Sequence, residues 1–368
     1  MKILHLSSEK TWRGGEQQIA YLLKELRQKG VKCFVACRKG SPFEDFCQRE
    51  KIPFKAFAFG NQYEIGTALG IKKYCQEVEA DIMHLHSSKS HMLGVIAHML
   101  GAKARLVLSR RVDFQIKQTW LTQFKYNYPA IDRIICVSKK IEEIARASVN
   151  RPDRCTTVHS GIDVTRFRMR PRTNWLRSRY GINPEKWLVG NTSALAPHKD
   201  YFTFLDTASI LLKEGVPAHF FIIGEGALKL QLQRYVREKG LKDAVTFTGF
   251  LQNIPEVLPG LDLFLITSEE EGLGTSVLDA FACGVPVVAT RAGGIPEMVL
   301  HEETGLAAPV KQPQLLAREV QKLLQTEGLA GQLAGNARRH LQHFTRQKTA
   351  AATLNIYKEI LQAPKHNH

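Results

Sequence analysis

The segment 268–289 contains two carboxylates and two glycines whose spacing suits the binding of a polar ligand. Glu271 directly precedes Gly272 and Gly274, and Asp279 follows eight residues after Glu271. The segment follows an apolar run and predicts a helix that begins at Thr275, so its first N–H groups could bind a phosphate while the carboxylates accept hydrogen bonds from sugar hydroxyls. In the alternative interpretation, 269–271 is only an acidic N-terminal cap that complements the helix dipole.

Two segments of the first half also carry polar residues directly after predicted strands. The segment 11–16 contains Gly14 and Gly15, a pair that allows a tight turn close to a pyrophosphate. Alternation along 81–86 places His84 and His86 on one face, and we choose His86 because it is nearer the carboxyl end of the strand. The alternatives are a plain turn capped by Glu16 and a buried structural histidine.

A third segment, 109–128, mixes cations with aromatic residues. Arg110 and Arg111 follow a predicted strand, and Lys117 and Trp120 come next. This mixture is typical of segments that lie on an anionic bilayer, and we expect it, with Arg13, on the acceptor or membrane side of the protein. The alternative is that the aromatic side chains pack in the core.

Composition sets the broad class of the protein. The 368 residues are 44% hydrophobic and 23% charged, which is typical of a globular chain of about two domains. The net charge of +16 is concentrated in residues 1–170, which carry 30 Lys and Arg against 16 Asp and Glu. No apolar run is long enough to cross a bilayer and no signal peptide is evident, so we expect a cytoplasmic protein that can also lie peripherally on the inner face of the cytoplasmic membrane. The seven cysteines predict reduced core thiols.

Short apolar runs alternate with amphipathic ones along the whole chain, which predicts an α/β fold with parallel sheets covered on both faces. Two Rossmann-like doubly wound domains that face a deep cleft between them account for the length. We expect domains at 1–165 and 185–340, a linker at 166–184, and a C-terminal helix in 341–368 that returns to the first domain. The expected strands are 2–7, 32–37, 82–85, 105–108, 133–137, 156–159, 188–192, 219–223, 245–248, 261–266 and 286–289.

These motifs together resemble glycosyltransferase family 4, the retaining nucleotide-sugar transferases with the GT-B fold. The family pattern is a Glu, seven residues and a second Glu, followed by Cys-Gly and Pro-Val-Val-Ala; here it runs from Glu271 to 286–289. The resemblance covers essentially the whole chain, because five more segments match in order: 158–167, 222–226, 248–250, 292–297 and 344–361.

The resemblance implies a role for each matching residue. Glu271 would contact the transferred sugar, Lys199 the diphosphate and Asp279 the ribose, while His86 would bind a sugar hydroxyl; Glu271, Lys199 and His86 are the catalytic candidates. Further donor contacts would come from Gly14, Gly15, Gly224, Phe250, Leu251, Gly272, Leu273, Gly274, Thr275 and Ser276. Two positions depart from the family: Asp279 replaces the usual Glu, and Ala194 replaces the Arg that precedes the Lys by five residues.

The sequence therefore predicts a retaining transferase that moves sugar from a nucleoside-diphosphate sugar, preferably UDP-linked, to a lipid-linked or cell-envelope glycan, such as lipopolysaccharide. The chain contains no Asp-x-Asp pair, so we expect transfer without a metal ion or other cofactor. One alternative is a nucleotide-sugar epimerase of the same fold. Another is a nucleic-acid-binding protein, because the net charge is strongly positive. No zinc-finger, helix-turn-helix or ribonucleoprotein motif supports this alternative.

Overall fold

The computed structural model describes residues 1–167 and 173–364, and within them the chain forms two compact units. Unit 1 contains residues 1–161 and the chain from Arg346 onward, and unit 2 contains residues 162–345. Part of the expected linker (168–172) and the last four residues (365–368) lie outside the described residues. Helix α7 (Trp175–Tyr180) lies inside the segment where the sequence predicts a linker.

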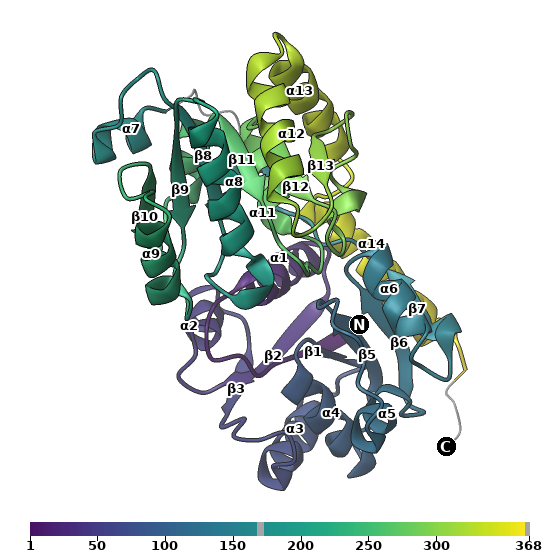
Figure 1. Cartoon of the computed structure of the whole chain (residues 1–368). Helices are drawn as coiled ribbons and strands as arrows, with labels where there is room; N and C mark the ends of the chain where they lie inside the picture. Colours follow the sequence, from purple (N-terminus) through teal and green to yellow (C-terminus); the bar gives the residue numbers. More distant parts are fainter. Residues whose placement is uncertain (168–172, 365–368) are drawn as a thin grey trace. The chain divides into compact units, whose positions relative to one another are not determined.

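Unit 1 is built on a parallel seven-stranded sheet with the order β3-β2-β1-β4-β5-β6-β7 (Figure 1). Its strands are β1 (Lys2–Ser7), β2 (Lys32–Arg38), β3 (Phe54–Phe57), β4 (Ile82–Leu85), β5 (Arg105–Arg110), β6 (Ile131–Cys136) and β7 (Cys155–Thr157). Its helices are α1 (Gly14–Gln28), α2 (Pro42–Arg49), α3 (Ile65–Glu77), α4 (Ser88–Met99), α5 (Trp120–Tyr126), α6 (Lys139–Arg146) and α14 (Arg346–Gln362).

Unit 2 repeats this arrangement on a six-stranded parallel sheet with the order β10-β9-β8-β11-β12-β13. Its strands are β8 (Trp187–Thr192), β9 (Ala218–Ile223), β10 (Val245–Gly249), β11 (Leu263–Ile266), β12 (Val287–Thr290) and β13 (Leu306–Ala308). Besides α7, its helices are α8 (Tyr201–Lys213), α9 (Lys229–Glu238), α10 (Ile254–Val257), α11 (Thr275–Cys283), α12 (Pro313–Gln325) and α13 (Leu329–Leu341).

The apolar runs of the sequence form the two cores. The central strand β1 is buried from Ile3 onward because helices cover both faces of the sheet, as a parallel sheet requires. Helix α14 packs against α1 on one face of the first sheet, so the end of the chain completes unit 1. The seven cysteines are free thiols, as the sequence predicts.

The strand order reverses at one point in each sheet. In unit 1 the reversal lies between β1 and β4, and in unit 2 between β8 and β11. Chain segments that leave these strand pairs at their carboxyl ends turn to opposite sides, which opens a crevice for ligands in doubly wound sheets. The fold therefore offers one candidate position for a ligand in each unit.

Candidate functional site

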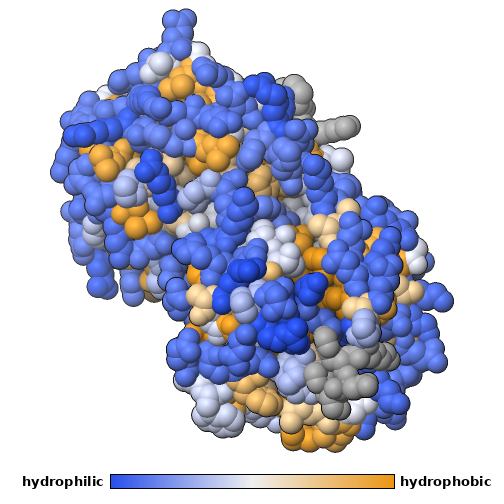
Figure 2. Space-filling model, turned by 90° about the vertical axis from the view of Figure 1, so that its right-hand side faces the viewer, coloured by the Kyte–Doolittle hydropathy of each residue, from blue (hydrophilic) through white to orange (hydrophobic). Residues whose placement is uncertain are grey.

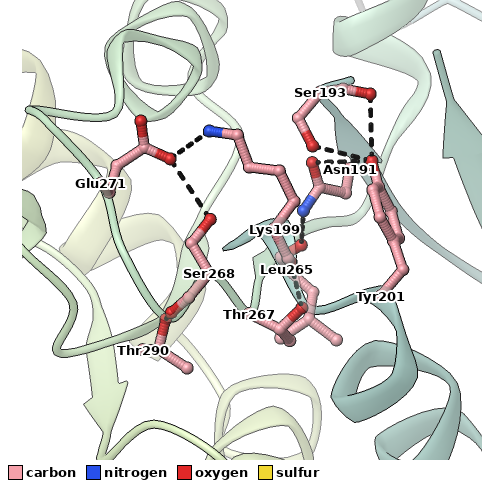
Figure 3. A network of polar contacts seen from close by, with 9 residues as sticks. All are labelled: Asn191, Ser193, Lys199, Tyr201, Leu265, Thr267, Ser268, Glu271 and Thr290. Carbon is pink, nitrogen blue, oxygen red and sulfur yellow. Dashed lines mark hydrogen bonds and ion pairs between the residues drawn. The ribbon is translucent and has the colours of Figure 1, made fainter. Parts of the chain in front are cut away.

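In unit 2, the segments that follow β8 and β11 bring together the first group of candidate residues. Lys199 ends a short 3-10 helix (Pro197–Lys199) after β8, and Glu271 lies in the loop between β11 and α11. Lys199 Nζ forms an ion pair with Glu271 Oε2, and Ser268 Oγ donates to the same oxygen at 3.2 Å (Figure 3). The side chains are only 15% and 13% exposed, so this pair is largely shielded from water.

A network of polar side chains holds the two loops in place. Asn191 Nδ2 donates to the carbonyl of Leu265 at 2.8 Å and so joins β8 to β11, while Tyr201 Oη lies 2.8 Å from Ser193 Oγ. Thr267 Oγ1 lies within hydrogen-bond distance of the carbonyl of Lys199, at 3.4 Å (Figure 3), and donates to the carbonyl of the next residue, Asp200, at 2.9 Å. Thr290 Oγ1 likewise donates to the carbonyl of Ser268 at 2.6 Å.

The sequence motifs did not point to these supporting residues. Their signal is a polar residue at or just beyond the carboxyl end of an apolar strand, as at Asn191, Thr267 and Thr290. Because they fix the backbone on both sides of the ion pair, Lys199 and Glu271 are positioned before any ligand arrives.

The start of α11 has a glycine turn and a first turn of N–H groups. Gly274 caps this helix with φ of +89°, and a Cβ on it would lie 3.1 Å from Glu271 Cγ, so a glycine is required there. Gly272, Thr275 and Ser276 are partly exposed around this turn, while Leu273 is buried. The first N–H groups of a helix have no intrahelical acceptor and carry a partial positive charge, which favours a phosphate.

Other predicted donor residues lie on neighbouring loops of unit 2. Gly224 follows β9 with φ of +152°, and a Cβ on it would meet the carbonyl oxygen of Ser193 at 2.1 Å, so the glycine allows the β8 and β9 loops to touch. Phe250 is 72% exposed after β10, and Leu251 is partly buried. Ala194, the position of the missing arginine, is exposed in the loop after β8.

Asp279 lies in the second turn of α11, and its environment favours the neutral acid. Desolvation raises the pKa of Asp279 to about 7, and the nearby positive charge of Arg166 opposes this shift without cancelling it. The 3-10 helix that contains Arg166 packs against α11, so Arg166 acts on Asp279 from within unit 2. Asp279 therefore changes its protonation state near neutral pH.

In unit 1, the carboxyl ends of β1 and β4 hold a buried group of three histidines. His5 of β1 pairs in register with His84 of β4, and His86 follows β4. His5 Nδ1 lies 3.0 Å from His86 Nε2, and His84 contacts Ser109 Oγ at 2.7 Å and the hydroxyl of Tyr357 on α14. Burial is the main reason that the pKa of His5 falls to about 3 and those of His84 and His86 fall well below their usual value. The three rings are therefore neutral at pH 7.

Arg111 orients this histidine group. It follows β5 and donates from Nη2 to His86 Nδ1 at 3.0 Å, so the proton of the neutral His86 ring stands on Nε2 and points to His5. Thus both ring nitrogens of His86, our predicted catalytic histidine, have partners within unit 1. Sequence reasoning missed His5, whose signal is its place on the strand that pairs with β4.

The glycine turn of the first half lies beside Arg111. Gly14 and Gly15 begin α1, and a Cβ on Gly15 would lie 3.9 Å from Arg111 Cδ. Glu16 is buried and accepts from the backbone N–H of Arg13 at 3.2 Å and from Ser7 Oγ at 3.4 Å. Burial is the main reason that the pKa of Glu16 is raised.

The histidine group is the one cluster of potential metal ligands found among the described residues, with one ligand atom of each histidine within 4.8 Å of the others. Its chemistry does not fit a metal cation. Arg111 places a guanidinium on His86, and His84 already uses both ring nitrogens. A cation would have to displace these contacts and tolerate a like charge nearby.

The 109–128 segment divides into buried and exposed residues. Arg110 is buried and donates from Nη1 to the hydroxyl of Tyr126 at 2.7 Å and from Nη2 to the carbonyl of Phe114, so it anchors α5 and the loop before it. Lys117 is exposed, and Trp120 is 75% exposed. No helix in the described part of the chain is long and apolar enough to span a membrane.

Comparison with known proteins identifies the family. The model for glycosyl transferases group 1 matches residues 174–340, and the model for Glycosyltransferase Family 4 matches residues 12–166. The chain belongs to this family, and it is a glycosyltransferase that uses nucleotide sugars.

Relatives and solved structures agree with this assignment. N-acetyl-alpha-D-glucosaminyl L-malate synthase of Bacillus anthracis is 25% identical, covering 83% of this chain and 81% of the relative. UDP-Gal:alpha-D-GlcNAc-diphosphoundecaprenol alpha-1,3-galactosyltransferase of Escherichia coli is 23% identical over 73% and 74% of the two chains. The crystal structure of Anabaena HepE with UDP and glucose superimposes with a TM-score of 0.86 at 21% identity, over 98% of this chain and all of that one, which confirms the GT-B fold.

We expect Glu271→Gln to lower the free energy of unfolding by about 1–3 kcal/mol, because it leaves the shielded Lys199 ammonium without its counter-charge. The matched control is Glu269→Gln, which removes the neighbouring carboxylate from an exposed pair with Lys311 and should change the stability by less than about 0.5 kcal/mol. Urea unfolding measures both. Equal losses in the two variants would contradict the argument, as would failure of Lys199→Met to recover stability in the Glu271→Gln background.

Proposed function

We propose that the protein is a retaining transferase that moves a sugar from a UDP-sugar to a hydroxyl group of a lipid-linked or other cell-envelope acceptor. The observation that carries this proposal is the Lys199–Glu271 pair beside the N-terminus of α11. Lys199 and the helix provide positive charge where the diphosphate leaves, and Glu271 provides an acceptor for the hydroxyls of the transferred sugar. Interactions of this kind act on charge that develops in the transition state.

The names of similar proteins support the choice of donor and acceptor. The Escherichia coli relative is named for a UDP-Gal donor and a diphosphoundecaprenol-linked acceptor, and HepE was crystallised with UDP and glucose. A lipopolysaccharide outer core galactosyltransferase shares the fold, with a TM-score of 0.74. A UDP-sugar and an envelope acceptor are therefore the first substrates to test.

We also propose that transfer needs no divalent metal. The sequence has no Asp-x-Asp pair, and Lys199 with the first turn of α11 offers the positive charge that such an ion would bring to a diphosphate.

Thermal unfolding with UDP, GDP, ADP and TDP sugars in the presence of EDTA tests the donor. We expect UDP-sugars alone to raise the melting temperature, because a ligand that binds only the folded state stabilises it. Glu271→Ala should weaken the shift from UDP-glucose more than that from UDP, since Glu271 is assigned to the sugar.

No shift with any of the nucleotides would contradict the proposed function, and a shift that requires Mg²⁺ would contradict metal independence. An epimer formed from the UDP-sugar without an acceptor would favour the epimerase alternative.

The raised pKa of Asp279 predicts that donor affinity depends on pH. If its carboxylate accepts the ribose hydroxyls, UDP affinity should rise as the pH increases from 6 to 8, through the pKa of about 7. The stability of the free protein changes in the opposite direction. Because the folded state holds the Asp279 proton more tightly than the unfolded chain does, the free energy of unfolding falls as the pH rises from about 4 to about 7. Calorimetric titration of UDP should show the rise in wild type and lose most of it in Asp279→Asn. An unchanged pH profile in that variant would contradict the assignment.

We further propose that unit 1 docks on an anionic bilayer through α5 and its neighbours. Helix α3 packs beside α4 and α4 beside α5. Large apolar side chains are exposed along these elements: Ile65, Leu69, Met99, Leu100, Val112, Phe114, Trp120 and Phe124. Figure 2 shows apolar patches among the hydrophilic residues of the surface. The positive charge of the N-terminal half would add attraction to anionic lipids.

Co-sedimentation with phosphatidylglycerol and phosphatidylcholine vesicles tests the docking surface. We expect binding to the anionic vesicles only, reduced about tenfold by Trp120→Ser with Phe124→Ser, because two aromatic anchors are lost. The matched control is Leu230→Ser, which removes a side chain that is 78% exposed on α9 of unit 2. Equal binding to both kinds of vesicle, or an equal loss in the control, would contradict the proposal.

A further inference from the structure

Arg111 is a desolvated cation without a matching carboxylate. Among the residues that the structure describes, its guanidinium makes one hydrogen bond, to the neutral His86, and takes part in no ion pair within 4.0 Å. Its Nε is buried and has no hydrogen-bond partner within these residues. Burial is the main reason that the pKa of Arg111 falls to about 10, so the side chain is still charged at pH 7.

The groups around Arg111 compensate its charge only in part, because burial still lowers its pKa despite the opposing effect of Glu16. The three histidines are neutral, and His5 Nε2 is a second buried nitrogen without a partner in the described chain. The carboxyl group that acts electrostatically on Arg111 is Glu16, whose own pKa is raised by burial and which accepts hydrogen bonds from Ser7 and from the backbone of Arg13. A buried charge is costly to folding unless it is paired, so this arrangement favours a bound anion.

The position of Arg111 is that of a ligand-binding residue. It follows β5 at the carboxyl edge of the sheet and contacts the glycine turn at the start of α1, beside the β1–β4 reversal of strand order. Arg111 as a residue is partly exposed, although its Nε is buried. A guanidinium binds carboxylate and phosphate oxygens with two parallel hydrogen bonds, so an anion that reaches this side chain would complete its pairing.

We propose that Arg111 binds an oxyanion of the acceptor substrate, a phosphate or a carboxylate, at the carboxyl edge of the unit 1 sheet. That the anion belongs to the acceptor rests on the proposed function, in which the donor-binding groups lie in unit 2. The oxyanion has a second possible source, which is the diphosphate of the donor, and the experiment separates the two.

The test uses the full-length protein and two probes, inorganic phosphate and UDP. We expect phosphate to raise the melting temperature of wild type and to bind at least about tenfold more weakly to Arg111→Gln, which loses a charge-assisted pair of hydrogen bonds. Without phosphate, Arg111→Gln should be as stable as wild type or more stable, since it removes an uncompensated charge. Arg49→Gln is the control, because it removes an exposed arginine of α2 from the same unit.

Each remaining outcome has one meaning. An equal phosphate effect in wild type and Arg111→Gln, or no effect in either, would overturn the proposal. If phosphate competes with UDP and Arg111→Gln weakens UDP to the same degree, the oxyanion is that of the donor and the acceptor assignment is wrong. If UDP produces no shift in any variant while the phosphate effect still depends on Arg111, the anion site stands and the proposed function fails.

Discussion

The reversal of strand order in each parallel sheet is the constraint on which the candidate sites depend. Because β1 and β8 each have neighbours whose connections run to opposite sides, the segments after β1, β4, β8 and β11 diverge and leave their first residues accessible. The Lys199–Glu271 pair, the histidine group and the glycine turn at the start of α1 all lie in or beside these segments. Most residues of these strands are buried and apolar, so polar groups that can meet a ligand are expected mainly toward the carboxyl ends of the strands.

The cations Lys199 and Arg111, one in each unit, have different partners. Lys199 in unit 2 has the carboxylate of Glu271 as its partner, and that pair is further held by Ser268. A donor diphosphate would compete with Glu271 for the ammonium and so release the carboxylate toward the sugar. Arg111 in unit 1 has a neutral imidazole as its hydrogen-bond partner and no carboxylate within ion-pair distance. The Lys199–Glu271 pair is therefore complete without a ligand, whereas the Arg111 site, as proposed above, would take an anion from a substrate.

The sequence was sufficient to predict the fold and most of the strands, because apolar runs and their alternation with helices are local signals. The short strands β3 and β13 were missed, since Phe54–Phe57 contains a lysine and Leu306–Ala308 has only three residues. The sequence also placed His84 and His86 on one face. It could not reveal that His86 is bonded to His5 and Arg111, because this depends on which strands are neighbours, and strand order is a property of the whole sheet.

The adjacent residues Arg110 and Arg111 show why a basic motif alone does not define a function. Successive side chains of a strand point to opposite faces, so the two guanidinium groups enter different surroundings. Arg110 bonds to Tyr126 and to the carbonyl of Phe114 and thereby positions α5, whose Trp120 is exposed. Arg111 donates a hydrogen bond to His86 and lies beside the glycine turn at the start of α1. Arg110 thus supports the proposed membrane surface only indirectly, by holding its apolar residues outward, while the charge available to a substrate in this motif is that of Arg111.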